Sequence, residues 1–180
     1  MGPIETLYLT IGVIVVLIGL ARGYVKELGS TVIILVALFI LTFFEESINS
    51  VVGGAAQGMF GAAEGATPNT ALSIFYSGVF IAIVFAGYAG RTLTFTGKPA
   101  PPPQGFLLSL LVGVINGYLI AGTLWYYQHA FDYPFFQPFD SNFTERAQQL
   151  ITFLPPALFS ENPVYWIIPV AVLLIIRVRG

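Results

Sequence analysis

Few side chains in this chain of 180 residues could carry out chemistry. The chain has no cysteine and a single histidine, His129, so thiol chemistry and metal sites with several histidines are excluded. His129 alone could bind a porphyrin-type pigment or a metal, but a lone histidine at a membrane interface is more often a polar anchor. We find no phosphate-binding loop, nucleophile–base pair or catalytic pair of carboxylates. The sequence therefore predicts a protein that is not an enzyme and that has no resident cofactor or metal.

Two further polar features could bind something. Residues 19–28 read Gly-Leu-Ala-Arg-Gly-Tyr-Val-Lys-Glu-Leu. In this motif Arg22 and Lys26 are one helical turn apart and could contact anionic lipid headgroups, and Glu27 could form an ion pair with a nearby base. Asn116 is the one strongly polar residue deep in an apolar stretch. It could form an interhelical hydrogen bond, which is the simpler role, or contact a substrate.

Composition indicates the surroundings in which these side chains act. Hydrophobic residues make up 56% of the chain and charged residues 9%, whereas a soluble domain has about 25% charged residues. Most of the apolar surface must therefore face lipid. The net charge of −2 argues against nucleic acid as a partner, since a nucleic-acid-binding protein carries a basic surface.

Apolar runs of nearly the length that crosses a bilayer recur along the chain. They predict an all-α fold, a polytopic transmembrane helical bundle of four or five spans that forms a single membrane domain over residues 1–180. Charged residues are absent from the middle of each predicted span, which weakens the case for a pump or an ion-coupled transporter. The predicted spans are residues 6–21, 30–44, 71–89 and 106–127, with a shorter fifth at 164–178.

The basic residues predict the orientation of these spans. Alternating spans would place six bases on one side and only Arg146 on the other. By the positive-inside rule the side with six bases is cytoplasmic, so the N-terminus is outside and the C-terminus inside. The six bases are Arg22, Lys26, Arg91, Lys98, Arg177 and Arg179.

Two segments on the predicted outer side lie between spans. Residues 52–66 are rich in Gly and Ala and predict an external loop or a short helix lying on the membrane. Residues 142–154 predict an amphipathic helix, in which Asn142 and Glu145 have the spacing of a capping box. This helix could lie in the membrane interface or pack as a lid on the outer end of the bundle. Its apolar face comprises Phe143, Ala147, Leu150, Ile151 and Leu154.

Small residues at every fourth position form stripes on two adjacent predicted spans. Such stripes let helix backbones approach closely in lipid, where there is no hydrophobic drive between helices. We therefore expect the two stripes to pack against each other or against a partner chain. The stripes are Gly78, Ala82, Ala86 and Gly90 on one span, and Gly113, Gly117 and Ala121 on the next.

The motif at 19–28, after an N-terminal span with an early acid (Glu5), resembles the colicin V production protein (CvpA) family. The resemblance covers spans one to four, and it departs from the family at Asn116, where an arginine is often found. It implies a multi-pass protein of the bacterial cytoplasmic (inner) membrane, with roles in toxin export and envelope maintenance and no established chemistry. The matching motif residues are Gly19, Arg22, Gly23, Lys26 and Glu27, and a second, glycine-spaced match comprises Gly105, Gly113, Asn116, Gly117 and Tyr118.

Three hypotheses for function follow. The leading one is a non-catalytic scaffold or accessory subunit of a larger inner-membrane complex, whose partners are the lipid bilayer and either other integral membrane proteins or further copies of itself. The second is a transporter or export component, which predicts a polar cavity near Asn116. The third is a pigment- or quinone-associated subunit of an energy-converting complex that would use His129.

Overall fold

The computed structural model describes residues 3–60, 68–89, 93, 95, 100–134 and 144–179. Helices account for most of this part of the chain, and it contains no strand. The prediction of an all-α fold is therefore confirmed for the described residues. The helices are α1 (Pro3–Arg22), α2 (Tyr24–Phe43), α3 (Glu45–Phe60), α4 (Pro68–Ala89), α5 (Gln104–Ala130), α6 (Glu145–Ile151), α7 (Pro155–Leu158), the 3₁₀ helix η1 (Pro163–Trp166) and α8 (Ile167–Arg179).

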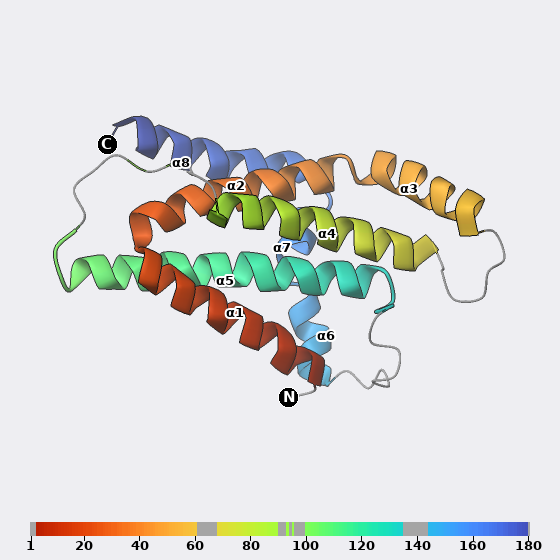
Figure 1. Cartoon of the computed structure of the whole chain (residues 1–180), viewed down its shortest axis with the longest axis horizontal. Helices are drawn as coiled ribbons and strands as arrows, with labels where there is room; N and C mark the ends of the chain where they lie inside the picture. Colours follow the sequence, from red (N-terminus) through yellow and green to blue (C-terminus); the bar gives the residue numbers. More distant parts are fainter. Residues whose placement is uncertain are drawn as a thin grey trace.

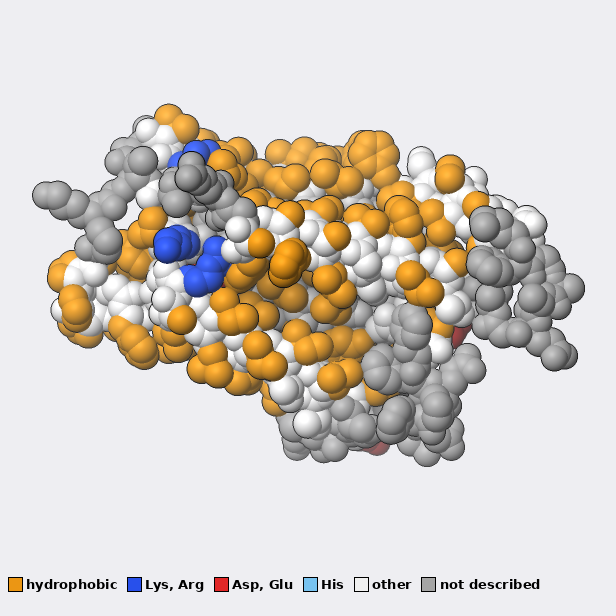
Figure 2. Space-filling model, in the orientation of Figure 1, with side chains coloured by type: hydrophobic (Ala, Val, Ile, Leu, Met, Phe, Trp, Pro, Cys, Tyr) orange, Lys and Arg blue, Asp and Glu red, His pale blue; other side chains and the backbone are white. Residues whose placement is uncertain are grey.

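Four helices, α1, α2, α4 and α5, are long and apolar enough to cross a membrane. They alternate in direction, so that α1 and α4 end where α2 and α5 begin (Figure 1). We call this the basic end, because Arg22, Lys26 and, near the end of α8, Arg177 lie there. Figure 2 shows Lys and Arg side chains gathered at this end and hydrophobic side chains along the flank. Because Arg91 and Lys98 lie outside the described residues, the orientation in a membrane stays a prediction.

The fifth predicted span corresponds to α8 and the preceding η1. Together they form an apolar helical segment from Pro163 to Val178 that is shorter than the four candidate spans. α8 packs along α2 on the opposite side from α1 (Figure 1). The structure therefore supports four helices of spanning length, and a fifth crossing stays a prediction.

Two segments differ from the boundaries predicted from hydropathy. The second span was predicted to begin at Ser30, but α2 begins six residues earlier, at Tyr24. The added residues 24–29 carry two charges, of which Lys26 is exposed and Glu27 is paired inside the bundle. A hydropathy pattern therefore gives no sign that the helix includes them. Of the predicted external segment 52–66, the described residues belong to α3, which packs against α4.

The predicted amphipathic helix is shorter than expected and begins at a different cap. α6 starts at Glu145 after Thr144, whose hydroxyl accepts a hydrogen bond from the Ala147 N–H. The predicted cap at Asn142 is wrong, and Asn142 and Phe143 lie outside the described residues. The buried side chains of Ala147 and Leu154 pack in a cluster with residues of α1 and α5, among them Tyr8. This contact agrees with the interpretation of α6 as a lid packed on the bundle. Whether α6 also lies in a membrane interface stays a prediction.

α2 is the central helix of the bundle. In the apolar window of α2 61% of the residues are buried, against 28% in α1 and in α4. Its side chains Ile34 and Leu38 share the main core with Phe80 of α4 and Leu119 of α5. The outer faces of α1, α4 and α5 carry many exposed aliphatic and aromatic side chains, as expected for surfaces that face lipid.

Candidate functional site

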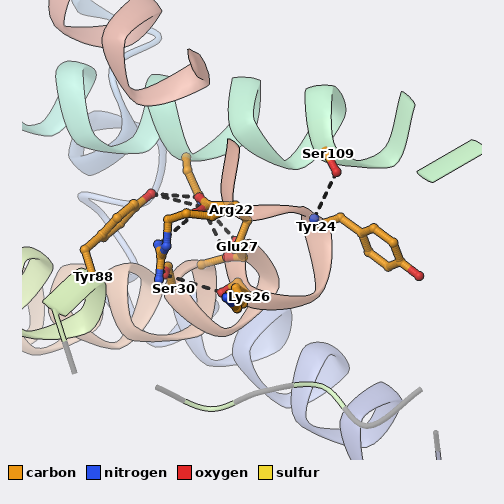
Figure 3. Close-up of polar contacts among 9 residues, drawn as sticks. Arg22, Tyr24, Lys26, Glu27, Ser30, Tyr88 and Ser109 are labelled. Carbon is orange, nitrogen blue, oxygen red and sulfur yellow. Dashed lines mark hydrogen bonds and ion pairs between the residues drawn. The ribbon is translucent and has the colours of Figure 1, made fainter. Parts of the chain in front are cut away.

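The main polar site of the described bundle lies inside its basic end, where α1, α2, α4 and α5 meet (Figure 3). We call it the Glu27 cluster. Several of its polar atoms, including a carboxylate, lie in the interior of a bundle that is largely apolar, which makes it the first candidate for function. Its members are Arg22, Glu27, Ser30, Thr31, Tyr88 and Asn116.

The carboxylate of Glu27 forms the centre of the cluster, and its side chain is 0% exposed. Its Oε1 accepts a hydrogen bond from Arg22 Nη1 of α1 at 2.7 Å, and the two groups form an ion pair. Its Oε2 accepts hydrogen bonds from the Tyr88 hydroxyl of α4 at 2.9 Å and from Asn116 Nδ2 of α5 at 2.8 Å. Both oxygens are thus engaged, and one carboxylate on α2 joins three other helices.

Asn116 forms a second set of hydrogen bonds between α5 and α2. Its Oδ1 accepts from Thr31 Oγ1 at 2.7 Å, and its Nδ2 also lies 3.2 Å from the backbone carbonyl oxygen of Glu27. The Asn116 side chain is 0% exposed. The predicted interhelical hydrogen bond is therefore confirmed, and both ends of the Asn116 amide are engaged by protein groups.

Arg22 reaches the cluster from the last turn of α1. Its Nη1 donates to Ser30 Oγ at 3.1 Å as well as to Glu27. Its guanidinium carbon lies 4.3 Å from the centroid of the Tyr88 ring, an arrangement that adds a cation–π attraction. The ion pair that the sequence predicted for Glu27 is therefore confirmed, with Arg22 as the partner.

Two glycines allow these helices to come together. Gly23 joins α1 to α2 with a φ of +83°, a conformation that side chains other than glycine rarely adopt. A Cβ atom at Gly19 would lie 2.9 Å from the Gly113 Cα and 3.5 Å from the Glu27 Cγ. A side chain at Gly19 would therefore push α1 away from both α5 and the carboxylate.

The small-residue stripe of α5 packs against α1. A Cβ atom at Gly117 would lie 2.7 Å from the carbonyl oxygen of Gly12, and one at Gly113 would lie 3.2 Å from that of Val16. Ala121 continues the contact, because a Cβ atom at Gly12 would lie 3.7 Å from its Cβ. The prediction that this stripe packs on the stripe of α4 is wrong. It packs instead on α1, where Gly12 lies opposite Gly117 and Gly19 lies opposite Gly113.

The stripe of α4 faces outward. Gly78, Ala82 and Ala86 are all exposed, and a Cβ atom at Gly78 would have no neighbour within 4 Å. Gly90, the last residue of the predicted stripe, lies outside the described residues. The other predicted alternative, contact of this stripe with a partner chain, therefore stays a prediction.

The remaining predicted site residues do not join the Glu27 cluster. The Lys26 side chain is exposed, although the residue lies next to the cluster in the chain (Figure 3). His129 is partly exposed near the other end of α5, and its ring centroid lies 5.7 Å from that of Tyr133. The described residues contain no group of three or more His, Asp or Glu that could hold a metal. A ligand role for His129 stays a prediction.

Sequence reasoning missed three members of the cluster, Ser30, Thr31 and Tyr88. Thr31 follows Glu27 by four residues and so lies on the same face of a helix, a signal that is visible only once α2 is known to begin at Tyr24. Tyr88 falls at the end of a predicted span, where an aromatic residue is read as an interface anchor. No local pattern pairs it with Glu27.

The geometry of the Glu27 cluster suits a structural connection between helices. A buried ion pair contributes little net stability, but removing one partner costs several kcal/mol because a charge is left uncompensated. Hydrogen bonds between helices in lipid each contribute about 0.6 kcal/mol on average and fix which residues face each other. The cluster therefore holds α1, α2, α4 and α5 in one register.

Comparison of the chain with protein-family models found no match, and comparisons with curated proteins and with solved structures found no significant match. The resemblance to the colicin V production protein family therefore stays a prediction.

Proposed function

We propose that this protein is a non-catalytic scaffold or accessory subunit of a larger membrane complex, and that it contacts its partner through the outer face of α4. In keeping with the resemblance of its 19–28 motif, we place it in the cytoplasmic membrane of a bacterium, with the basic end in the cytoplasm. The role is that of a rigid helical platform on which another membrane protein, or a second copy of this chain, docks.

The exposed stripe of α4 carries the proposal. Gly78, Ala82 and Ala86 form a shallow strip along the helix, because residues four apart lie on one face. Ile81 and Phe85, which are 52% and 70% exposed, lie beside this strip. A small-residue strip flanked by large side chains is the form of surface that lets a second transmembrane helix approach closely.

The interior of the chain supports the same reading. The equivalent stripe on α5 is already filled by α1, so this protein uses small residues to seat helices. The Glu27 carboxylate and the Asn116 amide are engaged by neighbouring helices. A polar centre that is closed in this way suits a platform better than a pathway for a substrate.

The test is co-purification of the tagged full-length chain from native membranes in a mild detergent. We expect the double variant Gly78→Leu with Ala82→Leu to lose its partner band or its dimer, because two large side chains would fill the strip. Val172→Phe serves as the control, because it adds bulk at an exposed position of α8. Retention of the same partners by the double variant would refute the proposal, provided that it elutes as a folded protein.

A second candidate function, a transporter or export component, is favoured by one observation. Ionisable groups within membrane spans often mark substrate or proton pathways, and Glu27 lies in the first turn of a candidate span. Under this alternative, Glu27→Gln would abolish flux in reconstituted liposomes while the chain stays folded. Absence of flux with the unaltered chain would remove the candidate.

A further inference from the structure

A groove opens on the surface of the basic end, next to the Glu27 cluster. It has a volume of about 500 Å³ and lies between the α1–α2 turn, the start of α5 and the segment that precedes α5. The described residues that line it include two bases, Arg22 and Lys26, and no acid. The groove is therefore electropositive on one wall.

The two bases differ in how much charge they leave for a ligand. Arg22 is neutralised by Glu27 at 2.7 Å. Lys26 is exposed and makes no ion pair with any carboxylate among the described residues. Counted over the described lining residues, the groove thus has one uncompensated positive charge, that of Lys26. This matches a ligand with a single negative charge, such as a phosphodiester.

A hydroxyl in another part of the groove adds a hydrogen-bond donor. Tyr24 lines the groove and points away from the Glu27 cluster (Figure 3). Its hydroxyl accepts a hydrogen bond from the Ala100 N–H at 3.0 Å, so the hydroxyl proton remains to donate to a ligand oxygen. An oxygen of the ligand's headgroup, apart from a charge held at Lys26, could accept this proton.

The remaining wall of the groove is apolar and continues onto the side of the bundle. Phe106 lines it and is 60% exposed, and the next residue, Leu107, is 58% exposed on the outer face of α5. A ligand that filled both parts would need a negatively charged head and a hydrocarbon chain that leaves along α5. An ordinary soluble phosphate compound has no such chain.

We propose that this groove is a binding site for one anionic phospholipid, with its phosphodiester at Lys26, a headgroup oxygen at Tyr24 and an acyl chain over Phe106. Basic pockets between transmembrane helices are known to take up lipid headgroups in this way. A lipid bound at this site would contact the segment that precedes α5, at Ala100 and Pro102. It is independent of the outer face of α4 and of the partner proposed there.

Native mass spectrometry of the full chain, released from detergent after incubation with matched lipids, tests the site. We expect phosphatidylglycerol to be retained as one tightly bound molecule in preference to phosphatidylcholine with the same acyl chains. Lys26→Gln should lower retention of phosphatidylglycerol about fivefold, equivalent to about 1 kcal/mol for one base. Lys26→Arg should restore it, and Arg177→Gln, a base on α8 outside the groove, should leave it unchanged.

Three results would overturn the proposal. The first is equal retention of the two lipids by the unaltered chain. The second is an equal loss in the Lys26→Gln and Arg177→Gln variants, which would show that net charge and not the groove attracts the lipid. The third is displacement of the lipid by soluble glycerol phosphate, which would make the groove a site for a soluble phosphate compound.

Discussion

Two stripes of small residues with the same spacing differ in their surroundings in this bundle: one is packed against another helix and the other is exposed. Gly113 and Gly117 of α5 lie against the backbone of α1, so closely that a Cβ atom at Gly117 would lie 2.7 Å from a carbonyl oxygen. Gly78 and Ala82 of α4 are exposed, and Gly78 has no neighbour that a Cβ atom would meet within 4 Å. Spacing alone therefore does not determine whether a stripe is used within the chain.

What separates the two stripes is the helix that faces them. α1 brings Gly12 and Gly19 opposite the stripe of α5, so both backbones can approach. α4 meets α2 and α5 with large buried side chains, Tyr76 and Phe80, and the stripe of small residues lies on its other, exposed face. In this bundle, a stripe of small residues is packed against another helix where that helix also has small residues facing it.

The largest expected effect is at the filled stripe. Gly117→Leu would drive a side chain into the backbone of α1. Overpacking costs about 1–3 kcal/mol and occasionally more, and a clash with rigid backbone belongs at the upper end of this range or above it. We expect aggregation or a strongly lowered unfolding midpoint in detergent, measured by size exclusion and thermal unfolding. Val114→Leu is the control, because Val114 is exposed on the same helix. A Gly117→Leu chain as stable as this control would break the comparison.

The next largest effect on stability is expected at the carboxylate of Glu27, which packs against Gly19. Glu27→Gln keeps the shape of the side chain but leaves the Arg22 charge without its partner, at a cost on the order of 3 kcal/mol. Unfolding by a denaturing detergent would measure the loss. Glu46→Gln, at an exposed position of α3, should change nothing. Equal stability of the two variants would mean that the Glu27 cluster does not hold the helices together.

A smaller effect is expected at Tyr88. Tyr88→Phe removes the hydrogen bond to Glu27 Oε2 but keeps the ring beneath Arg22, so the cost should be about 1 kcal/mol. The same unfolding assay applies. Combined with Glu27→Gln in a double-mutant cycle, the two losses should not add, since they share one contact. Additive losses would contradict the contact.

The smallest expected effect on the fold is at the open stripe. Gly78→Leu places its side chain in open space, so the unfolding free energy of the isolated chain should not fall by more than about 0.5 kcal/mol. Thermal unfolding of the purified monomer measures it. A large loss there would show that α4 is seated within the chain on this face, and the proposed docking surface would be lost with it.

The sequence was a good guide to the elements of this fold and a poorer one to their ends. Long apolar runs locate α1, α2, α4 and α5, because hydrocarbon requires a helix of that length. The start of α2 was missed, since the ion pair that allows Glu27 into the helix depends on Arg22 being folded back beside it. The cap of α6 was misplaced because Asn142 and Thr144 are both residues that can cap a helix.

The candidate site was predictable in three of its six residues but not in its arrangement. The chemistry of Arg22, Glu27 and Asn116 marked them in the sequence, and all three meet in the Glu27 cluster. These three residues come together because the chain turns at Gly23 and because α5 approaches α1. The spacing of residues within one helix predicts neither of these features. The same limit explains why the α5 stripe was assigned to the wrong neighbour.

The seating of α1 on α5 is tested most directly by a disulfide, because the chain has no cysteine of its own. A Cβ atom at Gly12 would lie 3.7 Å from the Ala121 Cβ, within the range of about 3.5–4.5 Å that disulfides require. We predict that the variant with Gly12→Cys and Ala121→Cys forms an intramolecular disulfide upon mild oxidation in membranes, seen as a shift on a non-reducing gel. The variant with Gly12→Cys and Ala82→Cys should not form one. A bond between positions 12 and 82, with none between 12 and 121, would contradict the account.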